Sequence, residues 1–286
     1  IADSSEPATF DNTIVAMERS GETLTRVSRI FFGLVQADTN DARQKIQEEV
    51  APKLAAHQDE INLDPKLFAR VKSLYDQRDT LELDPVQKRL VEHYYDGLVR
   101  AGAQLSDADK AKLKEMNAEL ANLGTKFSQN VQSEVNASAI TVDDVKQLDG
   151  LSKEQIAAAA EAAKARGQDG KYVITLLNTT GQPPLTNLAN RALRQKIYEA
   201  SVSRGSRGGE FDNTALVSRI MQLRADKAKL MGFPNFAAYN LTNQTAKTPE
   251  AVNAMLGKLA PAAVANAKRE AADLQAMIDQ EQKAAG

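Results

Sequence analysis

The sequence has no cysteine and no tryptophan, and only two of its 286 residues are histidine. Disulfide bonds and a catalytic thiol are therefore excluded, and a zinc site built from sulfur and imidazole ligands has too few donors. A net charge of −2, from 36 basic and 38 acidic side chains, gives no general attraction for nucleic acid or an anionic membrane. The longest strongly apolar run, Ile30–Val35, is far shorter than the roughly 20 residues of a membrane-spanning helix. We expect neither a nucleic-acid nor a membrane partner.

Aromatic residues make up only 5% of the chain, whereas hydrophobic residues reach 42% and alanine is frequent. This composition favours closely packed helices over a β-sandwich. Asp64-Pro65 and Asp84-Pro85 repeat one helix-start signal, a capping Asp followed by Pro at the first helical position. The sequence predicts further helices over 11–19 after the cap Thr9, from 22, and from 41. In the helix that starts at 22, Leu24, Val27, Phe31 and Leu34 form one apolar stripe at helical spacing. In the helix that Asp84-Pro85 opens, we expect Val86, Leu90, Tyr94 and Leu98 to be buried.

A longer helix is predicted from Ser106 to about Val135. Its apolar residues alternate three and four positions apart, at Leu113, Met116, Leu120, Leu123 and Phe127. We expect this seam to be bundle core, and the helix to pair with the preceding one across the Gly102 turn.

A β signal follows this helix. Residues 139–142 and 171–177 are rich in β-branched side chains and flank an alanine-rich helix over 153–166, which Ser152 and Gln155 open as a capping box. The predicted fold class is therefore mainly α, a multi-helix bundle with one small two-stranded β element.

The stretch from Asn190 to Thr242 carries the most specific pattern. One helix buries Leu193 and Ile197, and a second begins near Asp212 after the glycine-rich break Gly205–Gly209. Because no strand precedes the glycines and no Gly-Lys-Ser/Thr follows them, we reject nucleotide binding there. A turn reading Gly-Phe-Pro-Asn then leads into a third helix, and Thr248-Pro249 opens a final one with a bend expected at Pro261.

This order of motifs, N-R-x-L-R-x-x-x-Y-x-A, D-N-T and L-R-x-x-x-A-x-L-x-G-F-x-N-x-A-x-Y, resembles the thimet-oligopeptidase-like zinc metallopeptidases. Within the family the bacterial peptidyl-dipeptidases are the most similar, and Thr9–Val27 and Met231–Pro249 add support. The resemblance implies the N-terminal lobe of a two-lobed peptidase. It divides the chain into a loose polar lead over 1–8 and a helical lobe over 9–286. That lobe contains helical hairpins over 9–136, a small β/α insertion over 137–185 and helices of a substrate-channel wall over 186–286.

The zinc motif of that family, H-E-x-x-H, is absent from the sequence. The motif places two imidazoles on one helix face with a glutamate base between them, whereas His57 and His93 stand apart in LAAHQDE and VEHYYDG. We therefore expect no catalytic residue and no metal ligand in this chain. The resemblance implies zinc in the parent enzyme, held by a downstream segment, so the chain alone should be inactive.

Two groups of residues remain as binding candidates. The basic residues Arg191, Arg194, Lys196, Arg204 and Arg207 could bind phosphate or a peptide carboxylate. A solvated helix face, with Arg204 near the helix carboxyl end, is the favoured alternative. Asn136 and Asn178 flank the expected strands, where backbone edges could hold an extended peptide, and are our candidates for the substrate cleft. Turn-forming asparagine is the alternative for both.

The predicted function is thus the substrate-channel part of a zinc-dependent peptidyl-dipeptidase, an enzyme that releases dipeptides from the C-termini of oligopeptides. The alternative is a stand-alone helical module that binds peptides or proteins. We expect a cytoplasmic location. The periplasm stays open, because the sequence starts at Ile1 without a signal peptide and the natural N-terminus is expected to lie upstream.

Overall fold

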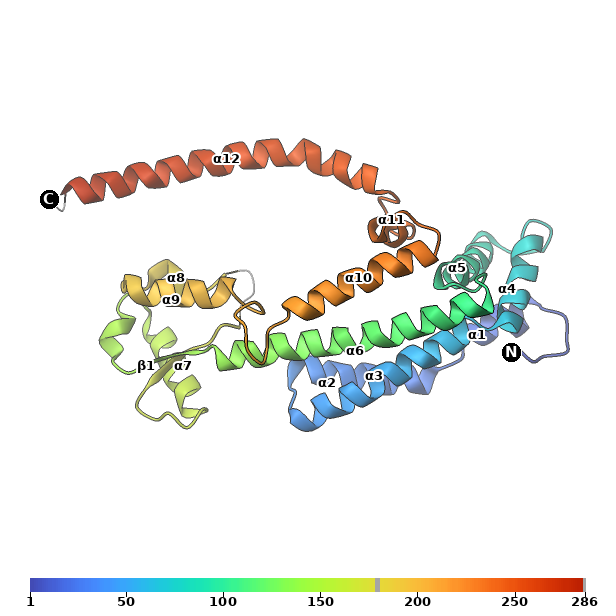
Figure 1. Cartoon of the computed structure of the whole chain (residues 1–286), viewed down its shortest axis with the longest axis horizontal. Coiled ribbons are helices and arrows are strands. Elements are labelled where there is room, and N and C mark those ends of the chain that lie inside the picture. Colours follow the sequence, from blue (N-terminus) through green and yellow to red (C-terminus); the bar gives the residue numbers. More distant parts are fainter. Residues whose placement is uncertain (178–180, 285–286) are drawn as a thin grey trace. The chain divides into compact units, whose positions relative to one another are not determined.

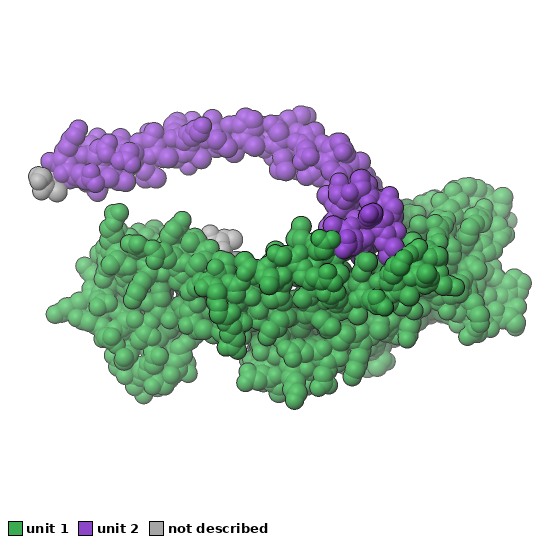
Figure 2. Space-filling view, viewed as in Figure 1, with its two compact units in different colours: residues 1–223 green, residues 224–286 purple. Residues whose placement is uncertain are grey.

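The computed structural model describes residues 1–177 and 181–284. Helices make up 71% of these described residues, and their β structure is one antiparallel pair of strands. The predicted fold class, mainly α with one small two-stranded element, is confirmed. The chain divides into two compact units, residues 1–223 and residues 224–286, coloured separately in Figure 2.

The first third of the chain is a series of helices that begin at the predicted caps. Thr9 and the third residue of its helix, Asn12, cap each other's backbone, and Asp84 and Gln87 form a second reciprocal pair. Asn40 and Asp64 each accept one amide of the following turn. The elements are η1 (Phe10–Val15), α1 (Ala16–Glu18), α2 (Glu22–Ala37), α3 (Asp41–Asn62), α4 (Pro65–Gln77) and α5 (Pro85–Ala101). Figure 1 labels α1 to α5.

The core of this region lies where α4, α5 and η1 meet. Ile14, Val71 and Val91 are completely buried in it, and Leu74 and Leu98 nearly so. The prediction that Val86 is buried is wrong, since 77% of it is exposed. Val86 lies in the first turn of α5, beyond the contact with α4, and the buried face of the helix begins further along. The prediction of Leu98 as a core residue is confirmed.

Residues 1–8, predicted as a loose polar lead, contact α4. The guanidinium of the buried Arg70 donates to the carbonyl oxygen of Glu6 at 2.7 Å and to the Asn12 side chain at 2.8 Å. Lys66 and Asp3 form an exposed ion pair at 2.5 Å. Arg70 thus fixes the backbone of the N-terminal residues by hydrogen bonds, since these residues have little apolar surface to bury.

Helix α2 carries its apolar stripe on the outside. Leu24, Val27 and Leu34 are exposed, and Phe31 and Phe32 lie edge to face on the same helix. Its one buried residue is Val35. The stripe therefore adds little to the core of the described residues.

The long helix is α6 (Asp107–Ala137), as predicted, but its pairing was predicted wrongly. It lies antiparallel along α3, not along the preceding helix α5. Polar side chains connect α3 and α6 near both ends of the helix pair and in its middle. Lys110 donates to the Leu63 carbonyl at 3.1 Å, Asn117 to the buried Asp59 at 2.7 Å, and Gln129 to the Gln44 carbonyl at 3.0 Å.

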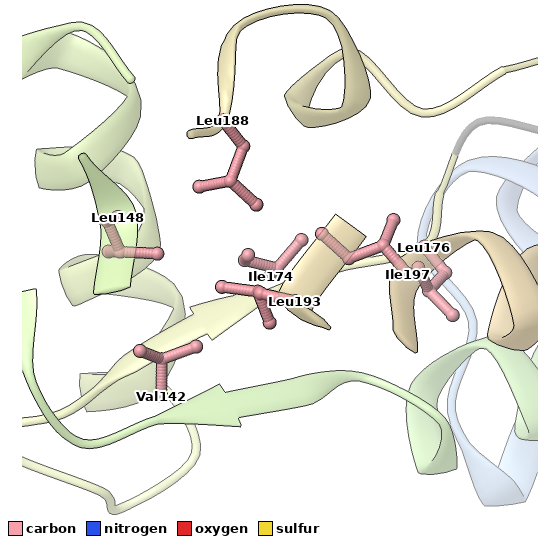
Figure 3. Packing of buried hydrophobic residues seen from close by; sticks show 7 residues of the cluster. All are labelled: Val142, Leu148, Ile174, Leu176, Leu188, Leu193 and Ile197. Atoms are coloured by element: carbon pink, nitrogen blue, oxygen red, sulfur yellow. The ribbon is translucent and has the colours of Figure 1, made fainter. Parts of the chain in front are cut away.

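A separate small core follows α6. It is built by β1 (Ile140–Val142), the turn η2 (Val145–Leu148), α7 (Lys153–Lys164), β2 (Tyr172–Ile174), α8 (Pro184–Asn187) and α9 (Arg191–Val202). Seven buried apolar side chains converge between the ladder and α9, as Figure 3 shows: Val142, Leu148, Ile174, Leu176, Leu188, Leu193 and Ile197. The predicted two-stranded ladder is confirmed, with Ile140 paired to Ile174 and Val142 to Tyr172.

Helix α10 (Thr214–Leu230) runs from the first unit into the second. The second unit continues with α11 (Phe236–Leu241), capped by Asn235, and α12 (Pro249–Ala284), which passes through Pro261. Phe233, Phe236 and Tyr239 pack on one another at the turn. No described residue of α12 is buried, and its large apolar side chains are exposed.

Candidate functional site

One of the two sequence-based cleft candidates, Asn136, lies near one end of the β-ladder. Because Ile140 pairs with Ile174, the chain enters β1 and leaves β2 at the same end. Asn136 is exposed there, in the last turn of α6, and its carbonyl accepts the amide of Ser138. Asn178 lies outside the described residues. Contact of Asn136 and Asn178 with substrate stays a prediction.

The same end of the ladder carries a buried carboxylate, Glu134, one turn before α6 ends. Its side chain is 8% exposed, accepts the backbone amide of Gly205, and lies 3.0 Å from Arg207 Nε. Asn130, one turn earlier, donates to Asn213 at 2.9 Å, and Asn213 donates to the Phe127 carbonyl at 3.1 Å. Helix α6 is thus joined through buried polar bonds to the glycine-rich loop between α9 and α10.

The loop is further fixed by Asp212. Its carboxylate accepts the Gly208 amide at 2.6 Å and the Thr214 amide at 2.8 Å, as well as the Thr214 hydroxyl. The hydroxyl bond first, and then the two amides, lower the pKa of the Asp212 carboxyl below its ordinary value. The carboxylate therefore stays ionised in this loop and caps α10.

The basic residues singled out in the sequence do not converge on one anion site. Arg194 donates to the carbonyls of Leu188 and Ala189, at 2.5 and 2.8 Å. Arg204 reaches the Leu176 carbonyl at 2.7 Å, and Arg207 contacts the Ala200 carbonyl in the last turn of α9. Arg191 and Lys196 are exposed, as the alternative of a solvated helix face expects, whereas the three other arginines bind backbone carbonyls. Arg207 supplies the contact with the carboxyl end of α9 that was expected from Arg204.

Both histidines line one cavity of about 660 Å³ near the N-terminus. Its apolar wall includes Ile61 and Leu67, and Tyr94 donates to Glu18 at 2.7 Å beside it. Burial first, and then this bond, raise the pKa of the Tyr94 hydroxyl. His57 and His93 are far apart in the sequence, and the sequence did not predict that they line the same cavity.

A zinc ion of the peptidase type does not fit the residues present. Across residues 1–177 and 181–284, no three or more His, Cys, Asp or Glu side chains are grouped so as to hold a metal ion. A catalytic zinc needs three protein ligands and an open position. Within the same described residues, no helix is both long and apolar enough to cross a bilayer.

Comparison with known proteins finds a family model and relatives that are peptidases. Residues 185–285 match the model of peptidase family M3. Over 273 residues, 96% of this chain and 40% of the relative, the sequence is 43% identical to a dipeptidyl carboxypeptidase of Escherichia coli (strain K12). The chain is related to peptidase family M3. A dipeptidyl carboxypeptidase of Salmonella typhimurium is 41% identical with the same coverage, and oligopeptidase A of Escherichia coli is 26% identical over 96% of this chain and 41% of that relative.

These relatives confirm the resemblance to this peptidase family, and the two bacterial dipeptidyl carboxypeptidases are more similar to the chain than oligopeptidase A is. The chain spans about 40% of the length of the curated relatives it matches. The family match covers α8 to α12 and includes the glycine-rich loop.

Sequence reasoning missed the buried polar residues of α6, although a signal for them was present. The spacing of three and four residues that links Leu113 to Phe127 continues to Asn130 and Glu134. Both lie on the buried face, as does the neighbouring Gln129. Polar residues on a helix seam often fix its partner and register. The seam therefore extends into the candidate site, where its side chains are polar instead of apolar.

Proposed function

We propose that this chain forms the substrate-channel part of a zinc-dependent peptidyl-dipeptidase, which releases dipeptides from the C-termini of oligopeptides. The observation that carries the proposal is the 43% identity to a dipeptidyl carboxypeptidase over 96% of the chain. Oligopeptidase A of the same organism is aligned over the same share of the chain at only 26% identity. The difference favours release of dipeptides as the mode of cleavage.

In this proposal the chain supplies binding surface and the zinc chemistry belongs to residues outside it. Zinc held by those residues would supply a Lewis acid for the peptide carbonyl and for water. The helices and the ladder end would hold the peptide in position, with Asn136 and Asn178 on the channel wall. A cytoplasmic location is part of the proposal, with the periplasm as the alternative.

The test compares the whole natural polypeptide with this chain alone. A nine-residue peptide is incubated with each, with and without a zinc chelator, and the products are followed by mass spectrometry. We expect the whole protein to shorten the peptide from its C-terminus by two residues at a time, and the chelator to stop it. Internal cuts without stepwise dipeptide loss would contradict the dipeptidase assignment. Dipeptide release by this chain alone would contradict the division of roles.

The wall residues need their own measurement. Replacing Asn136 by Ala in the whole protein should raise KM about two- to tenfold with kcat little changed, since a net neutral hydrogen bond contributes about 0.5–1.5 kcal/mol. Asn122→Ala, which removes an exposed amide from the same helix α6, is the matched control. An unchanged KM for Asn136→Ala would remove it from the wall and favour its role as a helix-end residue.

A further inference from the structure

The residues from 139 to 202, here named the β/α segment, have a hydrophobic core of their own. All seven buried members of that core, and the half-buried side chains packed on it, lie between Ile140 and Ala200. The extensive contacts of its elements among the described residues are internal: α7 with β2, β1 with β2, and α8 with α9. Such a unit can move relative to α3 and α6 without losing its core.

Two covalent connections join the β/α segment to the helices, and they meet at the same place. The first is the short exit from α6 through Ser138, and the second is the loop from Ser203 to Asn213. Gly205, Gly208 and Gly209 in that loop have φ values of 72°, 77° and 84°. Glycine adopts this left-handed conformation at little cost, so the loop can change shape where other residues would resist.

Glu134 spans both connections. It lies in the last turn of α6, just before the first connection begins. Its carboxylate binds Gly205 and Arg207, which belong to the second connection. Arg207 in turn contacts the Ala200 carbonyl of α9, inside the β/α segment. The buried Glu134 carboxylate and the partly exposed Arg207 thus form the ion pair that links α6 to the loop.

We propose that the β/α segment turns as a rigid unit on a hinge formed by residues 137–138 and 203–213, and that Glu134 is the latch of this hinge. The Glu134 side chain is 8% exposed and that of Arg207 32%, so the cost of desolvating the carboxylate offsets part of the attraction between the two charges. When the loop swings out, the Glu134 carboxylate regains water, which keeps the open position accessible. The ion pair and the bond to Gly205 favour the closed position, and their loss lets the segment populate both positions.

The absence of cysteine makes a direct distance measurement straightforward. Spin labels are attached to Lys126→Cys on α6 and Lys164→Cys on α7, both exposed, in the otherwise cysteine-free chain. Pulsed electron spin resonance then gives the distribution of distances between helix and segment. We expect one narrow distribution for the latched chain and a broader or second one for Glu134→Ala. The Gly205 amide should also exchange its hydrogen about ten- to hundredfold faster, as expected for loss of a charge-assisted bond.

Two control variants separate a latch from general stabilisation. Glu115→Ala removes an exposed carboxylate from the same helix, and Leu113→Ala destabilises its buried core. Both should keep the narrow distribution, even where Leu113→Ala lowers the denaturation midpoint. Should Glu134→Ala fail to fold, Arg207→Ala removes the ion pair and leaves Glu134 bound to Gly205, and it should broaden the distribution to a smaller extent.

A narrow distribution in the latch variants, or a broad one already in the unsubstituted chain, would overturn the proposal. Broadening by Leu113→Ala to the same extent would overturn it too. The measurement involves no catalysis, so its outcome is independent of the proposed peptidase function.

Discussion

At the scale of single residues, the fold depends on polar side chains buried among helices. Arg70 is 8% exposed and donates to Glu6, Asn12 and Thr13, and no carboxylate pairs with it among the described residues. An arginine can span several acceptors because its guanidinium is a rigid planar fork, which the point charge of lysine cannot imitate.

The first prediction is that Arg70→Ala lowers the free energy of unfolding by about 2–4 kcal/mol, from several lost bonds to a charged group. Arg70→Lys should restore only a small part of this. Urea denaturation of both variants, with the exposed Arg26→Ala as control, provides the measurement. Full recovery with lysine would show that the charge alone matters at this position.

The second prediction concerns pH and the pair Glu119–Arg219, which joins α6 to α10 through two bonds of 2.6 and 2.7 Å. The hydrogen bond from Arg219 lowers the pKa of Glu119 below its ordinary value of 4.5. A lowered pKa in the folded state means that the pair stabilises the fold above pH 4.5 and loses this effect as the pH falls through the folded value.

Carbon-13 NMR titration should therefore find the pKa of Glu119 below 4.5, and Arg219→Gln should raise it toward that value. Denaturation midpoints of the two proteins should differ more at pH 7 than at pH 3. An equal difference at both pH values would show that Arg219 acts through packing and not through this carboxylate.

At the scale of elements, helix starts were predicted well because capping is local. Asn40, Asp64, Asp84 and Ser152 each accept the amides that their sequence context indicates. Partners were predicted poorly. The seam of α6 has the right period for a pairing helix, but period does not say which helix is the partner, and α3 lies there instead of α5.

The candidate site shows the same division. The ladder and its end near Asn136 followed from β-branched runs, whereas Glu134 and its bonds to the glycine-rich loop depend on contacts about 70 residues apart in sequence, which no local pattern encodes. The stripe on α2 was recognised as apolar, but its exposure depends on whether another element covers it, which the stripe itself does not encode.

The third prediction compares positions along the seam of α6. Leu113 is completely buried and Leu120 and Leu123 are half-buried. Leu113→Ala should cost about 2–5 kcal/mol as a core truncation, and Leu120→Ala or Leu123→Ala less than that. Chemical denaturation of the three variants gives the ranking. Equal costs at all three positions would mean that the seam is covered more evenly than the structure shows.

At the scale of the whole molecule, the fourth prediction is that this chain alone does not bind zinc tightly. Its two histidines share a cavity, but no third ligand of the usual kind completes a site among the described residues. Calorimetry with zinc should show no stoichiometric binding, and His57→Ala should leave the result unchanged. Stoichiometric zinc binding that His57→Ala abolishes would contradict this expectation.

The fifth prediction concerns the apolar faces that the units leave exposed. Helix α12 has large apolar side chains on its surface, including Met255, Leu259, Leu274 and Ile278. Exposed patches of this kind on a monomer usually mark an interaction surface. We expect the isolated chain to associate with itself, or with further polypeptide of the whole protein, and Leu259→Lys with Leu274→Lys to reduce this. Sedimentation of a clean monomer for the unsubstituted chain would argue against it.

The antiparallel pair of α3 and α6 has a mechanical consequence. An apolar interface tolerates sliding, because one leucine replaces another at similar contact. Here the amides and charges that join the helices match at one register only, from Lys110 with Leu63 to Gln129 with Gln44. A shift by one helical turn, about 5.4 Å, would leave these groups unsatisfied all along the pair. The two helices should therefore resist sliding along their axes. Under a force applied at either end, the chain should bend elsewhere before α3 and α6 slide past each other.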